Sequence, residues 1–97
     1  MSKNIFLELN PETCAVFLNE EKQIASLIQV KSNDYDCYYV CDGLAYDVVQ
    51  QLNEVKISRE DLIETLLEEY DASLTELTSE ISKILNKFKK LDFLIES

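Results

Sequence analysis

Residues 41–97 decide the fold, because they contain three helix-patterned segments joined by very short connections. The segments read CDGLAYDVVQQL (41–52), ISREDLIETLLEEYDAS (57–73) and LTELTSEISKILNKFKKLDFLIES (74–97). Apolar residues recur in them at intervals of three and four, which is the spacing of one face of an α-helix. We therefore predict three consecutive α-helices in the second half of the chain.

Polar residues at the starts of these segments predict where the helices begin. Ser58 is followed three residues later by Asp61, and Ser73 by Glu76, which are the capping-box patterns of a helix N-terminus. Asp42 is the predicted N-cap of the first helix. The predicted inner faces consist of apolar side chains: Leu44, Ala45, Val48, Val49 and Leu52; Leu62, Ile63, Leu66, Leu67 and Tyr70; Leu74, Leu77, Ile81, Ile84, Phe88 and Leu91.

Four short apolar runs precede the helices, at residues 5–9, 13–18, 25–30 and 36–41. Short polar connections separate them, which favours antiparallel hairpins or a meander. The last three runs form the expected sheet, and the sequence leaves open whether 5–9 joins it as a fourth strand. The predicted fold class is α+β and winged helix-turn-helix-like, with an antiparallel β-meander followed by three helices and an apolar tail, Phe93-Leu94-Ile95, that returns to the core.

The length of 97 residues predicts a single domain over 1–97, with one modest core. No apolar run approaches the ~20 residues of a membrane span, and MSKNIFLELN at the N-terminus lacks the apolar segment of a secretion signal. We therefore expect a cytoplasmic protein without a membrane partner.

The composition argues against an enzyme. The chain has no histidine, so the usual general base near neutral pH is missing, and its single glycine excludes a glycine-rich phosphate loop. Cys14, Cys37 and Cys41 lack metal-site spacing and are expected to be reduced, buried thiols. We predict no catalytic residue, no metal and no cofactor.

The charge is strongly acidic and unevenly distributed. Nineteen acids and nine bases give a net charge of −10, which disfavours a winged-helix nucleic-acid-binding regulator because phosphate backbones would be repelled. Residues 42–80 contain eleven acids and two bases, whereas 83–90 contain four lysines and no acid. A second alternative is a non-catalytic structural adaptor that dimerises through the apolar stripe of the third helix.

The last strand and the third helix contain the candidate binding residues. The strand carries aromatic or apolar side chains on both faces: Cys37, Tyr39 and Cys41 on one, Asp36, Tyr38 and Val40 on the other. If it forms a sheet edge, its unpaired backbone groups can pair with an extended peptide. Lys83, Lys87 and Lys90 follow one another at helical spacing and form one stripe; they either flank a peptide groove or are simply solvated, with Lys83 paired to Glu80.

The order of these features resembles the PqqD-like family, the peptide chaperones of pyrroloquinoline quinone biosynthesis and of the wider group of RiPP recognition elements. The resemblance covers residues 14–95. It rests on a meander that ends in CYYVCD, a helix at 43–52, the segment ISREDLIETLLEEYDAS and the closing LTSEISKILNKFKKLDFLIE.

The resemblance implies that the leader segment of a ribosomally made precursor peptide adds as a strand to the sheet edge, beside the third helix. The residues it implies for peptide binding are Asp36, Cys37, Tyr38, Tyr39, Val40, Cys41, Leu77, Glu80, Ile81, Lys83, Ile84 and Lys87. Peptide side chains are expected to enter between Tyr38 or Val40 and Ile81 or Ile84. The implied partners are the precursor peptide and a modifying enzyme, such as a radical SAM protein, or a leader protease, to which this stand-alone protein presents the precursor.

Overall fold

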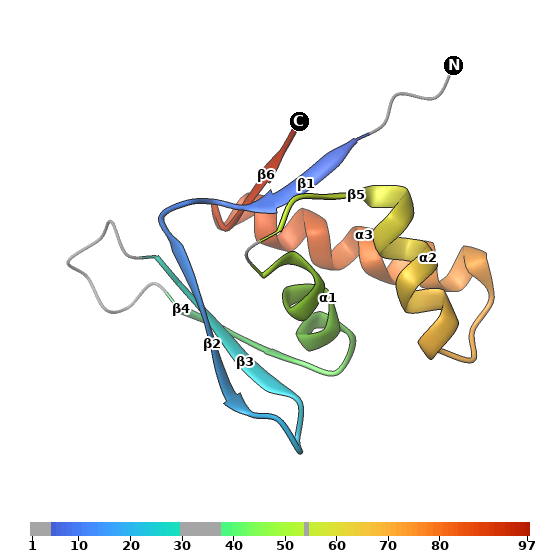
Figure 1. The fold of residues 1–97 in the computed structure, drawn as a ribbon, viewed down its shortest axis with the longest axis horizontal. Helices are drawn as coiled ribbons and strands as arrows, with labels where there is room; N and C mark the ends of the chain where they lie inside the picture. The colour runs from blue at the N-terminus through green and yellow to red at the C-terminus, as the bar shows by residue number, and fades with distance from the viewer. Residues whose placement is uncertain (1–4, 30–37, 54) are drawn as a thin grey trace.

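Residues 5–29, 38–53 and 55–97 of a computed structural model are described here, and they form two small sheets and three helices (Figure 1). The elements are β1 (Phe6–Leu9), β2 (Thr13–Asn19), β3 (Ile24–Gln29), β4 (Tyr38–Asp42), α1 (Leu44–Leu52), β5 (Ile57–Ser58), α2 (Arg59–Glu69), α3 (Leu74–Lys90) and β6 (Leu94–Glu96). The predicted α+β order, an antiparallel meander followed by three helices, is confirmed.

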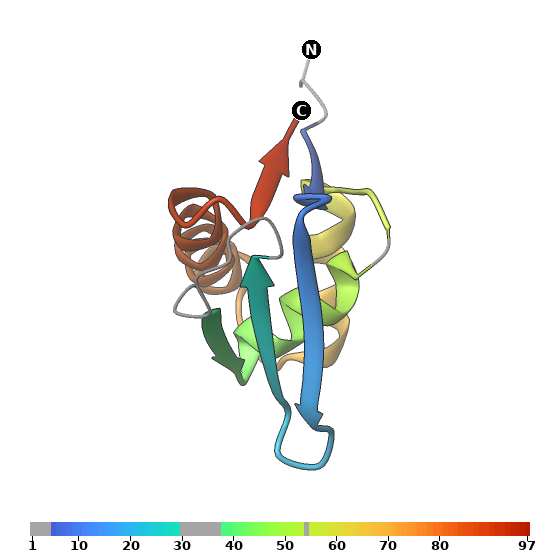
Figure 2. The same ribbon diagram turned by 90° about the vertical axis from the view of Figure 1, so that its left-hand side faces the viewer.

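The first sheet is the predicted meander, in the order β2-β3-β4 with antiparallel neighbours. Leu27 of the central strand lies opposite Ala15 on one side and Tyr39 on the other. Ala25 and Leu27 are fully buried, so this face of the sheet packs on the core. Figure 2 shows α1 behind the sheet and α3 beside β4, on the side away from β2.

The first apolar run forms a second sheet and does not join the meander. β1 lies between β5 and β6, and both pairings are antiparallel. Leu9 pairs with Leu94, so residues near the two ends of the chain lie side by side (Figure 1). Leu7, Phe93 and Leu94 are buried, which confirms that the apolar tail returns to the core.

Two of the three predicted helix caps are confirmed. The Ser58 side chain accepts a hydrogen bond from the Asp61 N–H at 3.1 Å, and Ser73 does the same for Glu76 at 3.2 Å. The prediction that Asp42 caps α1 is wrong, because Asp42 is the last residue of β4 and pairs with Ile24. Gly43 is the N-cap instead, with φ at 56°, and a glycine adopts this left-handed conformation without steric cost.

The buried face of α3 differs in part from the predicted stripe. Leu77, Ile81, Leu85 and Phe88 are buried, at spacings of four, four and three. Leu85 was not among the predicted residues, whereas Leu74 is 58% exposed and was expected inside. A straight helix has 3.6 residues per turn, so a stripe that repeats every seven residues drifts off the buried face over five turns.

Candidate functional site

β4 forms one edge of the meander sheet. In the described part of the chain it pairs only with β3, so the backbone groups on its other side have no strand partner there. Tyr38 is 61% exposed and Val40 is 51% exposed, so the outer face of the strand is open as well. Such an edge can accept a further strand.

The inner face of β4 is fixed against the core. The Tyr39 ring meets the Phe88 ring of α3 edge-on, with centroids 6.1 Å apart and an angle of 78° between the planes. Edge-to-face contacts of this kind add about 0.5–1.5 kcal/mol beyond the buried area. The Tyr39–Phe88 contact therefore holds the strand and the helix next to each other.

Cys41 lies on the same face of the strand as Tyr39, and its thiol is fully buried. Burial raises the pKa of the Cys41 thiol to about 12, and the negative charge of Asp42 adds to the effect. The reactive thiolate is therefore scarce at neutral pH, which argues against a nucleophilic role.

One flank of α3 carries side chains of mixed chemistry. Glu80, Ile84 and Lys87 follow one another at spacings of four and three, so they lie along one side of the helix. Ile84 is half-buried and packs against the core. The Lys83 ammonium lies 3.3 Å from the Glu80 carboxylate, and both side chains are mostly exposed, so this pair contributes little to stability.

The predicted site residues differ in how accessible they are. Tyr38, Val40, Glu80, Lys83 and Lys87 are exposed, Tyr39 and Ile84 are half-buried, Cys41, Leu77 and Ile81 are buried, and Asp36 and Cys37 lie outside the described residues. The exposed residues of the strand and of α3 are therefore accessible to a ligand, whereas Cys41, Leu77 and Ile81 are part of the core.

The expected arrangement of peptide side chains needs one correction. Tyr38 and Val40 project from the opposite face of the strand to Tyr39, which is the residue that contacts α3. Ile81 has no exposed surface, so it cannot form a groove with them. Side chains alternate between the two faces of a strand, so Tyr39 is the strand residue that meets α3, through Phe88. Ile84 of α3 is half-buried against the core.

Two contacts of this region were not anticipated from the sequence. The alternation of side chains in β4 and the aromatic residue in α3 are consistent with the Tyr39–Phe88 contact, but they do not specify it. The Gln29 side-chain amide donates a 2.6 Å hydrogen bond to the Leu91 carbonyl, which ties β3 to the end of α3. No sequence pattern announces that bond, because its partners are 62 residues apart.

Three further observations concern the described residues outside the edge of β4. No group of three or more potential metal ligands occurs there, and no helix in the described segments has the length and apolar character of a membrane span. A cavity of about 490 Å³ borders the opposite edge strand, where Cys14, Ala15 and Phe17 line it together with the turn at Asn10 and Pro11.

Comparisons with known proteins give two matches. Residues 9–94 match the model of the family described as coenzyme PQQ synthesis protein D (PqqD). The fold is similar to the solved structure of TbiB1 in complex with the TbiA(beta) leader peptide, with a TM-score of 0.75, 13% sequence identity, and coverage of 90% of this chain and 93% of that one. A comparison with curated proteins gives no match.

Proposed function

Because this chain belongs to the PqqD family, we propose that it binds the leader segment of a ribosomally made precursor peptide on the free edge of β4. The family match covers most of the chain and confirms the resemblance inferred from the sequence. TbiB1, which shares the fold, was solved with a leader peptide, and this supports a peptide as the ligand here.

The edge of β4 supplies the affinity in this proposal. An extended peptide pairs its backbone N–H and C=O groups with those of residues 38–42, which tolerates many peptide sequences. The observation that carries the proposal is the position of this open edge beside α3, held there by the Tyr39–Phe88 contact. A rigid edge loses little conformational entropy when the peptide binds.

The flank of α3 supplies the selectivity. Alternate peptide side chains point toward the helix, where Ile84 offers an apolar contact and Lys87 a positive charge. In the described part of the chain Lys87 has no ion-pair partner, so it is available to a carboxylate of the peptide. We therefore expect a leader with an apolar residue and an acidic residue two or four positions apart.

The protein carries out no covalent chemistry in this proposal. It raises the local concentration of the precursor at a modifying enzyme, such as a radical SAM protein, or at a leader protease. Exposed acids along α2, among them Glu60, Asp61, Glu64 and Glu68, form a negative surface that suits a basic patch on that partner enzyme. Precursor peptides are made by ribosomes, so the proposed place of action is the cytoplasm.

The adaptor alternative loses its main support in this structure. It required the apolar stripe of α3 to be available for dimerisation, yet Leu77, Ile81 and Phe88 of that stripe are buried within the domain. Its two end residues, Leu74 and Leu91, are exposed. The nucleic-acid alternative is opposed by the net charge of −10.

The proposal is tested by selecting linear peptides from a displayed library on the full chain, and then titrating a labelled binder or a candidate leader. Backbone amide shifts are recorded across the ¹⁵N-labelled protein. Saturable binding with shifts concentrated at residues 38–42 and 80–91 is expected. Saturable binding that moves only β2 amides would relocate the site, and no saturable binding of any peptide would end the proposal.

A further inference from the structure

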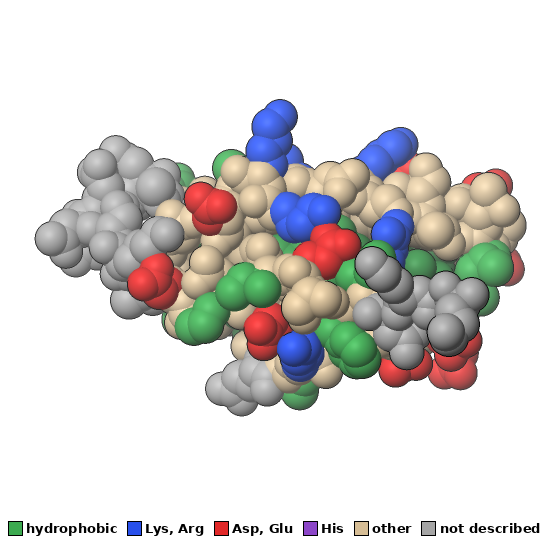
Figure 3. Space-filling view, turned by 90° about the horizontal axis from the view of Figure 1, so that it is seen from above, with side chains coloured by type: hydrophobic (Ala, Val, Ile, Leu, Met, Phe, Trp, Pro, Cys, Tyr) green, Lys and Arg blue, Asp and Glu red, His purple; other side chains and the backbone are tan. Residues whose placement is uncertain are grey.

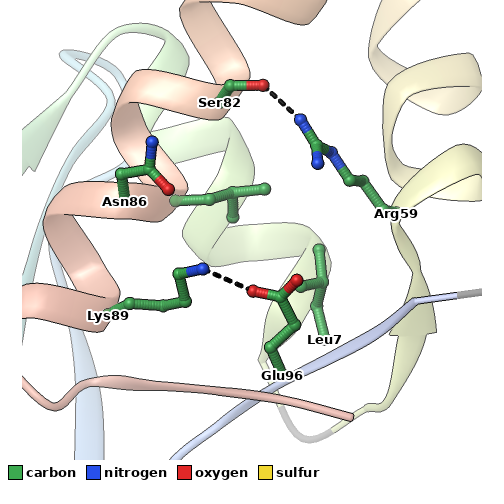
Figure 4. Close-up of a pocket in the computed structure, with 7 residues that line it drawn as sticks. Leu7, Arg59, Ser82, Asn86, Lys89 and Glu96 are labelled. Carbon is green, nitrogen blue, oxygen red and sulfur yellow. Dashed lines mark hydrogen bonds and ion pairs between the residues drawn. The ribbon is translucent and has the colours of Figure 1, made fainter.

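The flank of α3 that faces away from β4 lines a small polar cavity, of about 120 Å³. Ser82, Asn86 and Lys89 come from this flank at spacings of four and three, and Arg59 and Glu96 come from α2 and β6. Leu7 and Leu85 complete the lining (Figure 4). The cavity can hold a group of several non-hydrogen atoms.

Arg59 has an unusual position for the only arginine of a chain with nineteen acids. It is half-buried, and its guanidinium donates a hydrogen bond to the Ser82 hydroxyl across the cavity. Among the described residues no carboxylate forms an ion pair with it. A guanidinium has five N–H donors in a planar fork, and one neutral hydroxyl leaves most of them without a protein partner.

Lys89 approaches the cavity from the opposite side, and it already holds a carboxylate. Its ammonium lies 2.6 Å from the Glu96 carboxylate (Figure 4). Figure 3 shows that Lys and Arg side chains gather on the face that carries β1 and β6, with acidic side chains among them. The Glu96 contact shows that this environment accommodates a carboxylate.

We propose that this cavity is a second binding site, which takes a single carboxylate group between Arg59 and Lys89. Its lining has two cations and one anion, so it carries one net positive charge. A monocarboxylate neutralises that charge. A phosphate carries about −1.5 to −2 charges, so the occupied site would have a net negative charge. The two oxygens of a carboxylate also match the guanidinium fork, and Ser82 and Asn86 offer further donors.

The site is independent of the peptide edge, because the two occupy opposite flanks of α3. Glu80, Ile84 and Lys87 lie on one flank, and Ser82 and Asn86 on the other. A carboxylate can therefore bind here while a peptide occupies β4. The carboxylate has two sources, an acidic side chain of a protein partner or a free small acid, and the experiment below separates them.

The test uses the full ¹⁵N-labelled chain and follows the side-chain Nε–H signal of its one arginine, Arg59. Sodium acetate is titrated against sodium chloride at constant ionic strength, and inorganic phosphate forms a third arm. A saturable shift with acetate, weaker or absent with phosphate, is expected. No saturable shift with acetate or with the peptides below, or tighter binding of phosphate, would overturn the proposal.

Variants show whether the guanidinium acts as a ligand or only supports the fold. Arg59→Lys keeps the charge but loses the fork, and it should weaken acetate binding about tenfold, as followed by the Ser82 and Asn86 amides. Glu96→Gln removes the competing anion and should tighten binding by about fivefold, an effect that a merely structural Arg59 would not produce. Lys22→Gln, in the β2–β3 turn, is the charge-matched control and should leave acetate binding unchanged.

A pair of blocked tetrapeptides separates the two sources of the carboxylate. They are identical except that one contains glutamate where the other has glutamine. Tighter binding of the glutamate peptide than of acetate identifies a protein side chain as the ligand. Equal affinity for both acids identifies a small-acid site. If the glutamine peptide binds as well as the glutamate peptide and acetate does not bind, the cavity is not a carboxylate site.

Discussion

The two edges of the meander sheet differ in their surroundings more than in their backbone. β2 and β4 both pair with β3 alone in the described residues, so each has a side without a strand partner. β4 contacts α3 through the Tyr39 and Phe88 rings, whereas β2 borders the turn at Asn10 and Pro11. An open strand edge is thus common to both. Each strand also meets a helix through an edge-on aromatic contact, because the Phe17 ring of β2 lies 5.7 Å from the Tyr46 ring of α1. Of the two, β4 is the strand that contacts α3, the helix proposed to contact the peptide side chains.

The largest expected effect on leader-peptide affinity distinguishes a proline substitution in β4 from one in β2. Tyr38→Pro at the first residue of β4 should lower leader-peptide affinity by at least about tenfold, because one or two hydrogen bonds of about 1 kcal/mol each are lost and the edge is distorted. Leu18→Pro is the matched control, since Leu18 lies at the bulge of β2 and is 58% exposed. Fluorescence titration of labelled leader measures both.

The opposite outcome of this titration would contradict the proposed site. If Leu18→Pro abolishes binding and Tyr38→Pro does not, the peptide occupies β2. Circular dichroism confirms in each case that the helices remain folded.

The next largest effect tests whether α3 contacts the bound peptide. Ile84→Ala should lower affinity by about fivefold, since about 1 kcal/mol of apolar contact with a peptide side chain is lost. Leu74→Ala is the control on the same helix, because Leu74 is exposed at its first turn. Isothermal titration gives both affinities, and equal values for the two variants would show that α3 does not contact the peptide near Ile84.

A smaller effect is expected for the lysines. Lys83→Gln together with Lys87→Gln should weaken binding of an acidic leader about two- to threefold, because exposed ion pairs contribute about 0.2–1 kcal/mol each. The difference should vanish at 1 M salt, where screening is strong. Lys22→Gln, in the β2–β3 turn, changes the charge in the same direction far from α3 and should leave affinity within error. A loss of affinity that persists at high salt would contradict a charge contact.

The smallest effect at neutral pH concerns the cysteines of the two strands. Cys41 has a pKa of about 12 in the folded protein and 9.0 ordinarily, so its contribution to stability is present below about pH 9 and is lost as the pH rises toward 12. Cys41→Ala should therefore flatten the fall of the unfolding free energy over this range. Cys14→Ala on β2, where the thiol is exposed, should not. Urea unfolding at pH 8 to 11 measures both.

Tyr70 contributes to the same alkaline transition from another part of the core. Its pKa is raised from 10.0 to about 12, first by burial and then by the hydrogen bond it donates to Asp47. Stability from this group is also present below about pH 10 and lost toward 12. The Cys41→Ala curve should accordingly keep a residual slope, which a further Tyr70→Phe change removes; a flat curve in the single variant would contradict a contribution from Tyr70.

The fold class and most element positions could be predicted from the sequence because their signals are local. Ser58 and Ser73 cap the helices that follow them, as their spacing to the next acids indicates. The strand runs also lie within one or two residues of the predictions at most ends. The cap of α1 failed because Asp42 has a competing partner in the sheet, Ile24, which no local pattern reveals.

The candidate site could be predicted only in outline. The strand and the helix were identified by residue type and spacing, but their relative orientation depends on contacts between distant residues. Tyr39 rather than Tyr38 faces α3 because of the register Leu27 to Tyr39. Shifting that register by one residue would exchange the two faces.

By itself, the sequence determined the order of strands and helices, the starts of α2 and α3, the acidic charge and the family. These properties depend on residue types and on spacings of a few residues, so they do not require contacts between distant parts of the chain. Only the tertiary structure decided that β1 pairs with β6, that β4 stands at an open edge beside α3, and that Arg59 meets Ser82 across a cavity. Those results depend on which distant surfaces pack together, and packing is a property of the whole core rather than of any one segment.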